Sequence, residues 1–166
     1  MKHEPLFLRV VNNRAGVVDA CKAFSSSKHP ETAKVASAVL NKEEPYKYDF
    51  ETFRGDFREC LLDLIDNGIT PQVKSYLDSY MAPALEEDVE EESYSQKGAT
   101  RRSVHIKDGE QPWAEALVCY NLCLFISTGE LSQLKKCKKC GRFFTGRGKY
   151  AAYCGDACKL GKESPQ

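Results

Sequence analysis

The chain has 166 residues, a formal net charge of zero and a hydrophobic content of 42 %. This length suits one ordinary domain or a domain with a small module, and the apolar content supports a buried core, which excludes general disorder. The most hydrophobic stretch, residues 114–126, is shorter than the roughly 18 residues that a transmembrane helix needs. The first residues do not resemble a signal peptide, so we expect a cytoplasmic protein without membrane contact.

The neutral total hides an asymmetry of charge along the chain. Residues 132–166 contain nine basic and two acidic side chains, a formal charge of +7, and residues 1–131 carry −7. A basic tail on an acidic body suggests nucleic acid as a partner of the tail. Lysines beside metal-bound thiolates would also offset the negative charge of such a site, so both explanations stay open.

Two segments of the body favour strands. Residues 6–11 are apolar and β-branched and are ended by Asn12, and residues 101–106 predict a second short strand that could pair with the first. Between these segments, the acidic run 86–92 could imitate a polyanion, but a solvated helix end or exposed loop explains it more simply. The polar residues 93–100 that follow predict a loop.

The rest of the body predicts helices. Their signals are capping residues at the start, apolar residues at helical spacing, and glycine at the end. The candidates are residues 15–24, residues 30–40, a helix capped by Asp49 and closed by Asn67 and Gly68, one from Thr70 and Pro71 through Met81, and one that Gln111 and Pro112 open and that runs through Ile126. The last is apolar nearly all round, which predicts the central element of the core.

Four of the eight cysteines lie in the body. Cys119 and Cys123 are four residues apart on the last predicted helix and could in principle bind metal, but no histidine or further cysteine flanks them. Core packing is the better interpretation for these two and for Cys21 and Cys60, because free cysteine is among the most buried residue types. The three histidines are isolated in sequence and indicate no catalytic site.

The other four cysteines, Cys137, Cys140, Cys154 and Cys158, have the spacing C-x2-C-x13-C-x3-C. Two thiolate pairs at such distances are typical of one tetrahedral zinc ion. A disulfide framework is the first rival, but a reducing cytoplasm disfavours it. A redox Cys-x-x-Cys pair and an iron–sulfur cluster are the others. Four thiolates would fill the coordination sphere of one Zn²⁺, so the sequence predicts a structural rather than catalytic metal.

The residues around the cysteines predict a treble-clef zinc finger. Gly141 suits the tight turn of a zinc knuckle, and the three-residue gap from Cys154 to Cys158 places two sulfurs on one turn of a helix. Residues 142–145 and 149–153 are short aromatic-rich runs around a glycine turn, which predicts a hairpin between the two pairs. We therefore expect a mainly helical body with a small antiparallel sheet (residues 1–132) and a C-terminal treble-clef module (residues 133–166).

The segment from Gln111 to Cys158 resembles bacterial proteins that join an ABATE domain to a CGNR zinc finger. The resemblance lies in Gln111-Pro112-Trp113, in Cys137-Lys138-Lys139-Cys140-Gly141-Arg142-Phe143-Phe144 and in Tyr153-Cys154-x-x-x-Cys158. It implies a stress-linked transcription regulator whose finger contacts DNA. This chain has Lys159-Leu160-Gly161 where that family has Gly-Asn-Arg. The cysteine pairs are also similar to those of the small zinc proteins that inhibit DNA gyrase, in which the finger binds a protein.

The sequence thus predicts a zinc-binding nucleic-acid regulator. Phosphate contacts are expected from the basic residues nearest the cysteines, which are Lys138, Lys139, Arg142, Arg147 and Lys149. The alternative is a protein-interaction module or inhibitor without nucleic-acid contact, and a third interpretation is a finger that merely caps the helical core. No phosphate-binding glycine loop, nucleophile elbow or His-Glu-x-x-His segment is present, so we do not expect an enzyme.

Overall fold

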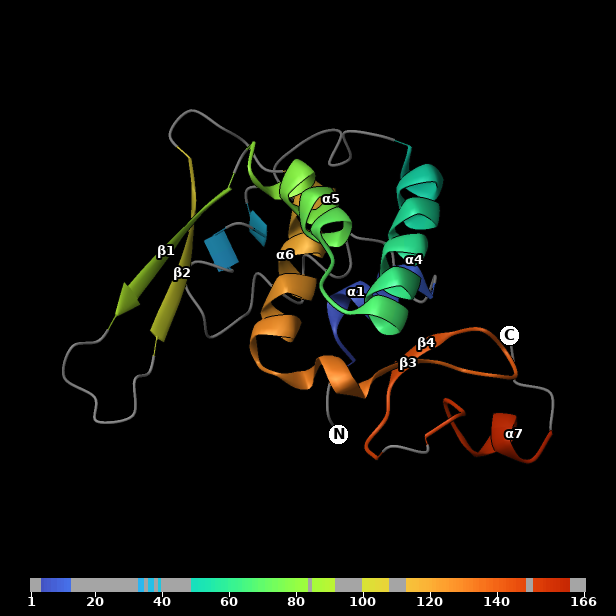
Figure 1. Ribbon diagram of the computed structural model, residues 1–166. Coiled ribbons are helices and arrows are strands. Elements are labelled where there is room, and N and C mark those ends of the chain that lie inside the picture. Colours follow the sequence, from blue (N-terminus) through green and yellow to red (C-terminus); the bar gives the residue numbers. More distant parts are fainter. Residues whose placement is uncertain are drawn as a thin grey trace.

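The protein has a helical body and one separate two-stranded ribbon (Figure 1), and its C-terminal part holds a cluster of four cysteines. The computed structural model describes residues 4–12, 33–34, 36–37, 39, 49–83, 85–91, 100–107, 113–148 and 151–161. The elements are α1 (Leu6–Val11), α4 (Phe50–Asn67), α5 (Pro71–Met81), β1 (Leu85–Glu91), β2 (Thr100–Ile106), α6 (Ala114–Ser127), the 3-10 turn η1 (Glu130–Gln133), β3 (Leu134–Lys136), β4 (Phe143–Thr145) and α7 (Asp156–Lys159). The predicted fold class, mainly helical with a small antiparallel sheet, is confirmed.

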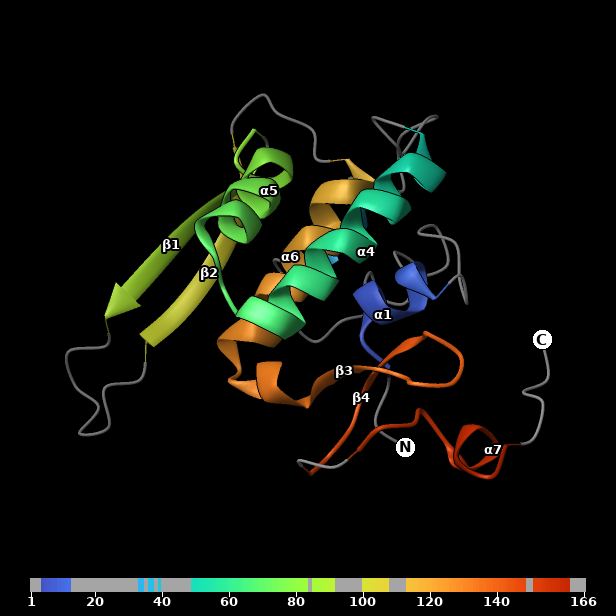
Figure 2. The same cartoon turned by 45° about the vertical axis from the view of Figure 1, so that its right-hand side comes forward.

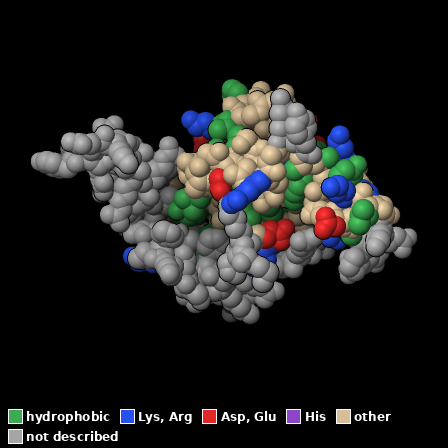
Figure 3. Space-filling view, turned by 90° about the horizontal axis from the view of Figure 1, so that it is seen from below, with side chains coloured by type: hydrophobic (Ala, Val, Ile, Leu, Met, Phe, Trp, Pro, Cys, Tyr) green, Lys and Arg blue, Asp and Glu red, His purple; other side chains and the backbone are tan. Residues whose placement is uncertain are grey.

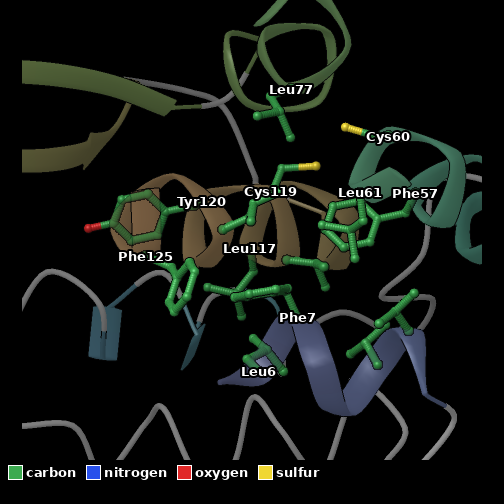
Figure 4. Packing of buried hydrophobic residues seen from close by; sticks show 14 of the residues in the cluster. Leu6, Phe7, Phe57, Cys60, Leu61, Leu77, Leu117, Cys119, Tyr120 and Phe125 are labelled. Carbon is green, nitrogen blue, oxygen red and sulfur yellow. The ribbon is translucent and has the colours of Figure 1, made fainter. Parts of the chain in front are cut away.

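Helix α6 is the centre of the core, as its apolar sequence predicted. Residues 114–120 are all buried, and α6 contacts both α1 and α5. Figure 2 shows α6 behind α4, and Figure 4 shows Leu117 and Phe125 directed toward Phe7 of α1. The Phe7 and Phe125 rings meet edge to face with centroids 5.3 Å apart. A helix buried on nearly all sides needs partners on several faces, and α1, α4 and α5 supply them.

The boundaries of α4 and α5 follow the predicted capping signals. The Asp49 carboxylate accepts a hydrogen bond from the Thr52 amide at 3.0 Å, and Gly68 closes α4 with φ +75°. The Thr70 hydroxyl accepts from the Val73 amide at 3.2 Å, ahead of Pro71 as the first residue of α5. Both starts therefore satisfy an amide that the helix itself leaves unpaired.

The predicted strand at residues 6–11 is wrong, because the segment forms α1. Pro5 begins the helix, and Asn121 of α6 accepts a hydrogen bond from the Phe7 amide at 3.2 Å through its side-chain oxygen. Five of the six residues of α1 are buried against α4, α6 and β4. For so short an apolar run, tertiary packing and local hydrogen bonding outweigh the β-propensity of its valines.

The second predicted strand is present, but its partner is the acidic run. β2 pairs antiparallel with β1, and the register places Glu90 opposite Arg101 and Glu86 opposite His105. The expectation of a solvated helix end or loop at residues 86–92 is therefore wrong for 86–91, as is pairing of residues 101–106 with 6–11. Figure 1 shows the ribbon at the side of the body away from α4.

Several predictions concern residues outside the described ranges. These are the helix at 15–24 and the loop at 93–99, together with Gln111 and Pro112 at the start of α6. Of the helix predicted at 30–40, the described residues are helical, and Ala36 and Val39 are buried. Across the part of the chain that the structure describes, no helix combines the length and the apolar character needed to cross a bilayer.

Candidate metal centre

The structure brings together the four cysteines that the spacing singled out. The Sγ atoms of Cys137, Cys140, Cys154 and Cys158 all lie within 4.8 Å of one another. The Cys140 and Cys154 sulfurs are 3.5 Å apart, and the Cys154 and Cys158 sulfurs are 3.6 Å apart. A tetrahedral Zn²⁺ with bonds of about 2.3 Å to sulfur requires edges of about 3.8 Å between sulfurs. The four thiols can therefore hold one metal ion of this size.

The first cysteine pair lies on the turn between β3 and β4. The Cys137 amide donates to the Arg142 carbonyl at 2.8 Å, and the Gly141 amide donates to the Cys137 carbonyl at 3.0 Å. Gly141 has φ +70°, a conformation that favours glycine, so the knuckle is formed as its sequence predicted. The hairpin, however, is formed by β3 and β4 across this knuckle, whereas the sequence placed it between the two cysteine pairs.

The second pair lies at the start of α7. Cys158 is within this helix and buried, whereas Cys154 precedes the N-cap residue Gly155. The two sulfurs therefore do not share one helical turn as expected, although they still converge on one point. The Lys138 amide donates to the Ala152 carbonyl at 3.0 Å and holds this segment beside the knuckle. Between the pairs the described residues contain one strand, β4, so the treble clef stays a prediction.

The thiols differ in acidity. Burial acts to raise the pKa of Cys137, but backbone amides of Cys140, Cys154 and Lys139 donate to its sulfur and lower the pKa to about 6. Burial raises the pKa of Cys154 to about 12, and hydrogen bonds with the Cys140, Cys158 and Cys137 thiols act in the same direction. A knuckle that directs amide groups at a sulfur stabilises its thiolate, which is the form that binds metal.

The donor set and the geometry together fit a metal site better than a pair of disulfides. None of the seven described cysteines is in a disulfide, and the sulfur separations of 3.5 and 3.6 Å are far above the roughly 2.05 Å of a disulfide bond. Four thiolates suit a soft or borderline metal rather than Ca²⁺ or Mg²⁺, which take oxygen ligands. If all four bind one Zn²⁺, no coordination position is left for a catalytic water.

Two residues of the body hold the strand that follows the knuckle. The Asn12 side chain donates to the Phe143 carbonyl at 2.7 Å and accepts from the Phe143 amide at 3.0 Å, which satisfies the outer edge of β4. The Arg58 guanidinium lies 5.1 Å from the centre of the Phe143 ring and donates to the Val11 carbonyl at 3.2 Å and the Gly141 carbonyl at 3.4 Å. The sequence did not predict a contact of either residue with the C-terminal module, because these contacts span large separations along the chain.

The described basic residues that were predicted to contact phosphate differ in their exposure. Lys138, Lys139 and Arg147 are exposed, Arg142 is half-buried, and Lys149 lies outside the described residues. Figure 3 views this end of the molecule from below and shows separate basic side chains toward its right, with acidic and apolar side chains among them. In this view the basic side chains therefore share their surface with acidic and apolar ones.

The described cysteines of the body are apart from this cluster. Cys60 and Cys119 are buried in the space between α4, α5 and α6 (Figure 4), and burial raises the pKa of the Cys60 thiol to about 11 and that of Cys119 well above its ordinary value. Cys21 lies outside the described residues. Sequence reasoning did not single out Glu115 of α6, which is 1 % exposed and carries a buried carboxylate.

Comparison with known proteins gives no family for the chain. No family model matches the sequence, and no curated protein matches it. The function is therefore argued from the cysteine site and its surroundings.

Proposed function

We propose that this chain is a zinc-binding protein in which one structural Zn²⁺, held by the four clustered cysteines, keeps a basic C-terminal module folded for binding to nucleic acid. The observation that carries the proposal is the convergence of four sulfurs within 4.8 Å. The module has little apolar content of its own, so metal binding would supply much of its folding free energy. Its role is binding and regulation rather than catalysis.

Metal content is the first test. Protein purified under reducing conditions with zinc present should contain about one zinc per chain. Replacing buried Cys158 with serine should remove that zinc, whereas replacing Cys123 of α6 with alanine should not, because Cys123 lies outside the cluster. Wild-type protein without bound metal, or a Cys123→Ala variant that loses it, would contradict the assignment.

The charge of the module supports nucleic acid as its partner. Two exposed lysines, Lys138 and Lys139, lie on the knuckle itself, and Arg147 is exposed beyond β4. Cations held on a rigid turn can neutralise several phosphates at once and release their counterions. The resemblance to the ABATE and CGNR proteins supports the same role, that of a transcription regulator.

The test is the salt dependence of binding to labelled DNA and RNA. Affinity should fall steeply as salt rises, and glutamine at Lys138, Arg142 and Arg147 should reduce the slope by about 0.7 to 0.9 for each lost phosphate contact. Glutamine at Lys74, an exposed lysine of α5, is the matched control and should change nothing. No binding at low salt, or binding that these three substitutions leave unchanged, would refute nucleic-acid contact.

A protein partner is the second candidate, and one observation favours it. Tyr153 is 41 % exposed and Leu160 is 66 % exposed, so two large apolar side chains flank the second cysteine pair. Exposed apolar groups beside a rigid site are typical of a docking surface, as in the resemblance to the gyrase inhibitors. A partner that stays bound at high salt and is lost when both residues become serine would favour this candidate.

A further inference from the structure

A cavity of about 500 Å³ lies beside the metal centre. Its lining includes the aromatic residue Phe144, two arginines and two neutral polar residues, and Cys154 brings it next to the second cysteine pair. These residues are Gln133, Arg142, Phe144, Thr145, Arg147 and Cys154. The volume falls within the roughly 300 to 1000 Å³ that is usual for sites binding a small organic group.

The polar groups of this cavity suit a nucleobase with its phosphate better than a phosphate alone. Glu4 and Glu130 also line the cavity, and each interacts with another residue of the protein. A bare phosphate site would be lined by donors, whereas the edge of a base offers both donors and acceptors. Gln133, Thr145 and the two carboxylates supply acceptors, and Arg142 and Arg147 supply cations for the neighbouring phosphate.

The described part of the module contains no element that could enter the major groove of a duplex. That groove admits a helix or a two-stranded ribbon and is about 8.5 Å deep. Helix α7 has four residues, and β3 and β4 have three residues each. Leu134 and Phe143 of this ribbon are 3 % and 1 % exposed, and Asn12 occupies the backbone edge of Phe143. The ribbon is therefore committed to the body.

From this combination we infer that the nucleic acid bound by the module is single-stranded and that one base stacks on Phe144, with Arg142 and Arg147 on the adjoining phosphates. Proteins that bind single strands pair an aromatic platform with cations along the backbone, and stacking tolerates any base. The inference rests on the proposed function, because it names the class of nucleic acid that the same site takes.

The first experiment compares strands with duplexes on the zinc-loaded full chain. Fluorescein-labelled oligo-dT and oligo-U and a blunt DNA duplex of equal length are titrated at low salt and followed by anisotropy. The single strands should bind at least about tenfold more tightly than the duplex, because only an unpaired base can leave its stack to reach Phe144. Equal or tighter binding of the duplex overturns the inference and leaves nucleic-acid binding standing.

The second experiment removes the aromatic ring of Phe144, on which the base is proposed to stack. Phe144→Leu should weaken oligo-dT binding by at least about fivefold, the lower end of what one lost stack costs, and leave duplex binding unchanged. Phe50→Leu is the control, because it removes a half-buried ring at the start of α4, in the body. Unchanged affinity of Phe144→Leu for oligo-dT, with its zinc content intact, overturns the inference.

A tryptophan at the same position gives a reading that does not depend on affinity. The natural chain contains one tryptophan, Trp113, which caps α6 in the body, so the signal of Phe144→Trp can be read by difference. Oligo-dT should quench the added fluorescence, because a stacked base contacts the indole. Binding without quenching places the strand elsewhere and overturns the inference, whereas absence of binding to any strand or duplex by the natural chain refutes the proposed function itself.

Discussion

The body and the C-terminal module obtain their buried contacts in different ways. The body buries large side chains from several helices, with Phe7, Phe57, Leu61 and Leu117 each completely buried. Among the described residues from 137 onward, the buried ones are Cys137, Phe143, Gly146 and Cys158. Phe143 is thus the one large apolar side chain that this mostly polar described segment buries. Where the body uses a continuous apolar core, the module depends on sulfur atoms that a metal can join.

The comparison also shows how the two regions are connected. Leu134 and Phe143 belong to the same apolar cluster as α1, α4 and α6, so the core of the body continues past residue 132. The boundary predicted between residues 132 and 133 stays a prediction, but the packing ties β3 and β4 to the body. The metal is therefore expected to order the thiols and α7 more than it orders the ribbon.

The largest effect should come from removing the metal. Structural zinc contributes about 10 to 16 kcal/mol of binding free energy in small zinc domains, and few apolar contacts replace it in residues 137–161. After chelation, hydrogen exchange should accelerate strongly at Lys159 of α7 and at its C-cap residue Leu160, whose amides donate hydrogen bonds within this segment. The amides of α4 and α6 should stay protected. Equal loss of protection in α6 would show that the two regions fold as one unit.

A smaller effect is expected from Asn12, which joins the regions without touching the cysteines. Asn12→Ala removes two hydrogen bonds and leaves the Phe143 amide and carbonyl unpaired, at a cost of about 2 to 3 kcal/mol in the free energy of unfolding. Asn67→Ala is the matched control, because its hydrogen bond to Asp63 is exposed and should contribute within about 0.5 kcal/mol.

Urea unfolding of the zinc-loaded protein measures both variants. Asn12→Ala should shift the midpoint to lower urea while zinc content stays at one per chain. Loss of zinc along with stability would mean that Asn12 supports the metal site directly. A midpoint equal to that of Asn67→Ala would mean that β4 is held by the ribbon and the metal alone.

What the sequence predicted correctly depends on neighbouring residues. The starts of α4 and α5 follow from Asp49, Thr70 and Pro71, because a cap and its amide are three residues apart. The knuckle follows from Cys137, Cys140 and Gly141 for the same reason. Each of these signals lies within one turn of the chain, where local chemistry decides the conformation.

The elements that the sequence predicted wrongly depend on contacts between distant residues. Residues 6–11 have the composition of a strand and form α1 because α6 and β4 surround them, and the contact of Asn12 with Phe143 joins residues 131 positions apart. Likewise, in the part of the chain that the structure describes, β4 pairs with β3, whereas the sequence placed the partner of residues 142–145 after them. A short apolar run does not specify its partner, so register and packing had to come from the structure.

The smallest expected effect concerns Asp49 and tests the body separately from the metal. The Thr52 amide and the Thr52 hydroxyl both donate hydrogen bonds to the Asp49 carboxylate, and the amide has the larger effect. Together they hold the pKa of Asp49 below its ordinary value of 3.8. The stability that this ionised cap contributes is therefore present above the ordinary pKa and is lost as pH falls through the lowered one. Asparagine at this position also accepts the hydrogen bonds, but it does not titrate.

Thermal unfolding of wild type and Asp49→Asn should therefore differ in their response to acid. Acid also protonates the cysteines and releases zinc, but both proteins share that loss, so the difference between their melting temperatures reports the cap of α4 alone. Relative to the variant, the wild type should lose stability as the pH falls below about 4, where the free carboxyl is half protonated, and this loss should continue down through the lowered pKa of the folded state. A difference that is constant over this range would show that the charge of Asp49 does not stabilise α4 and that its hydrogen bonds alone form the cap.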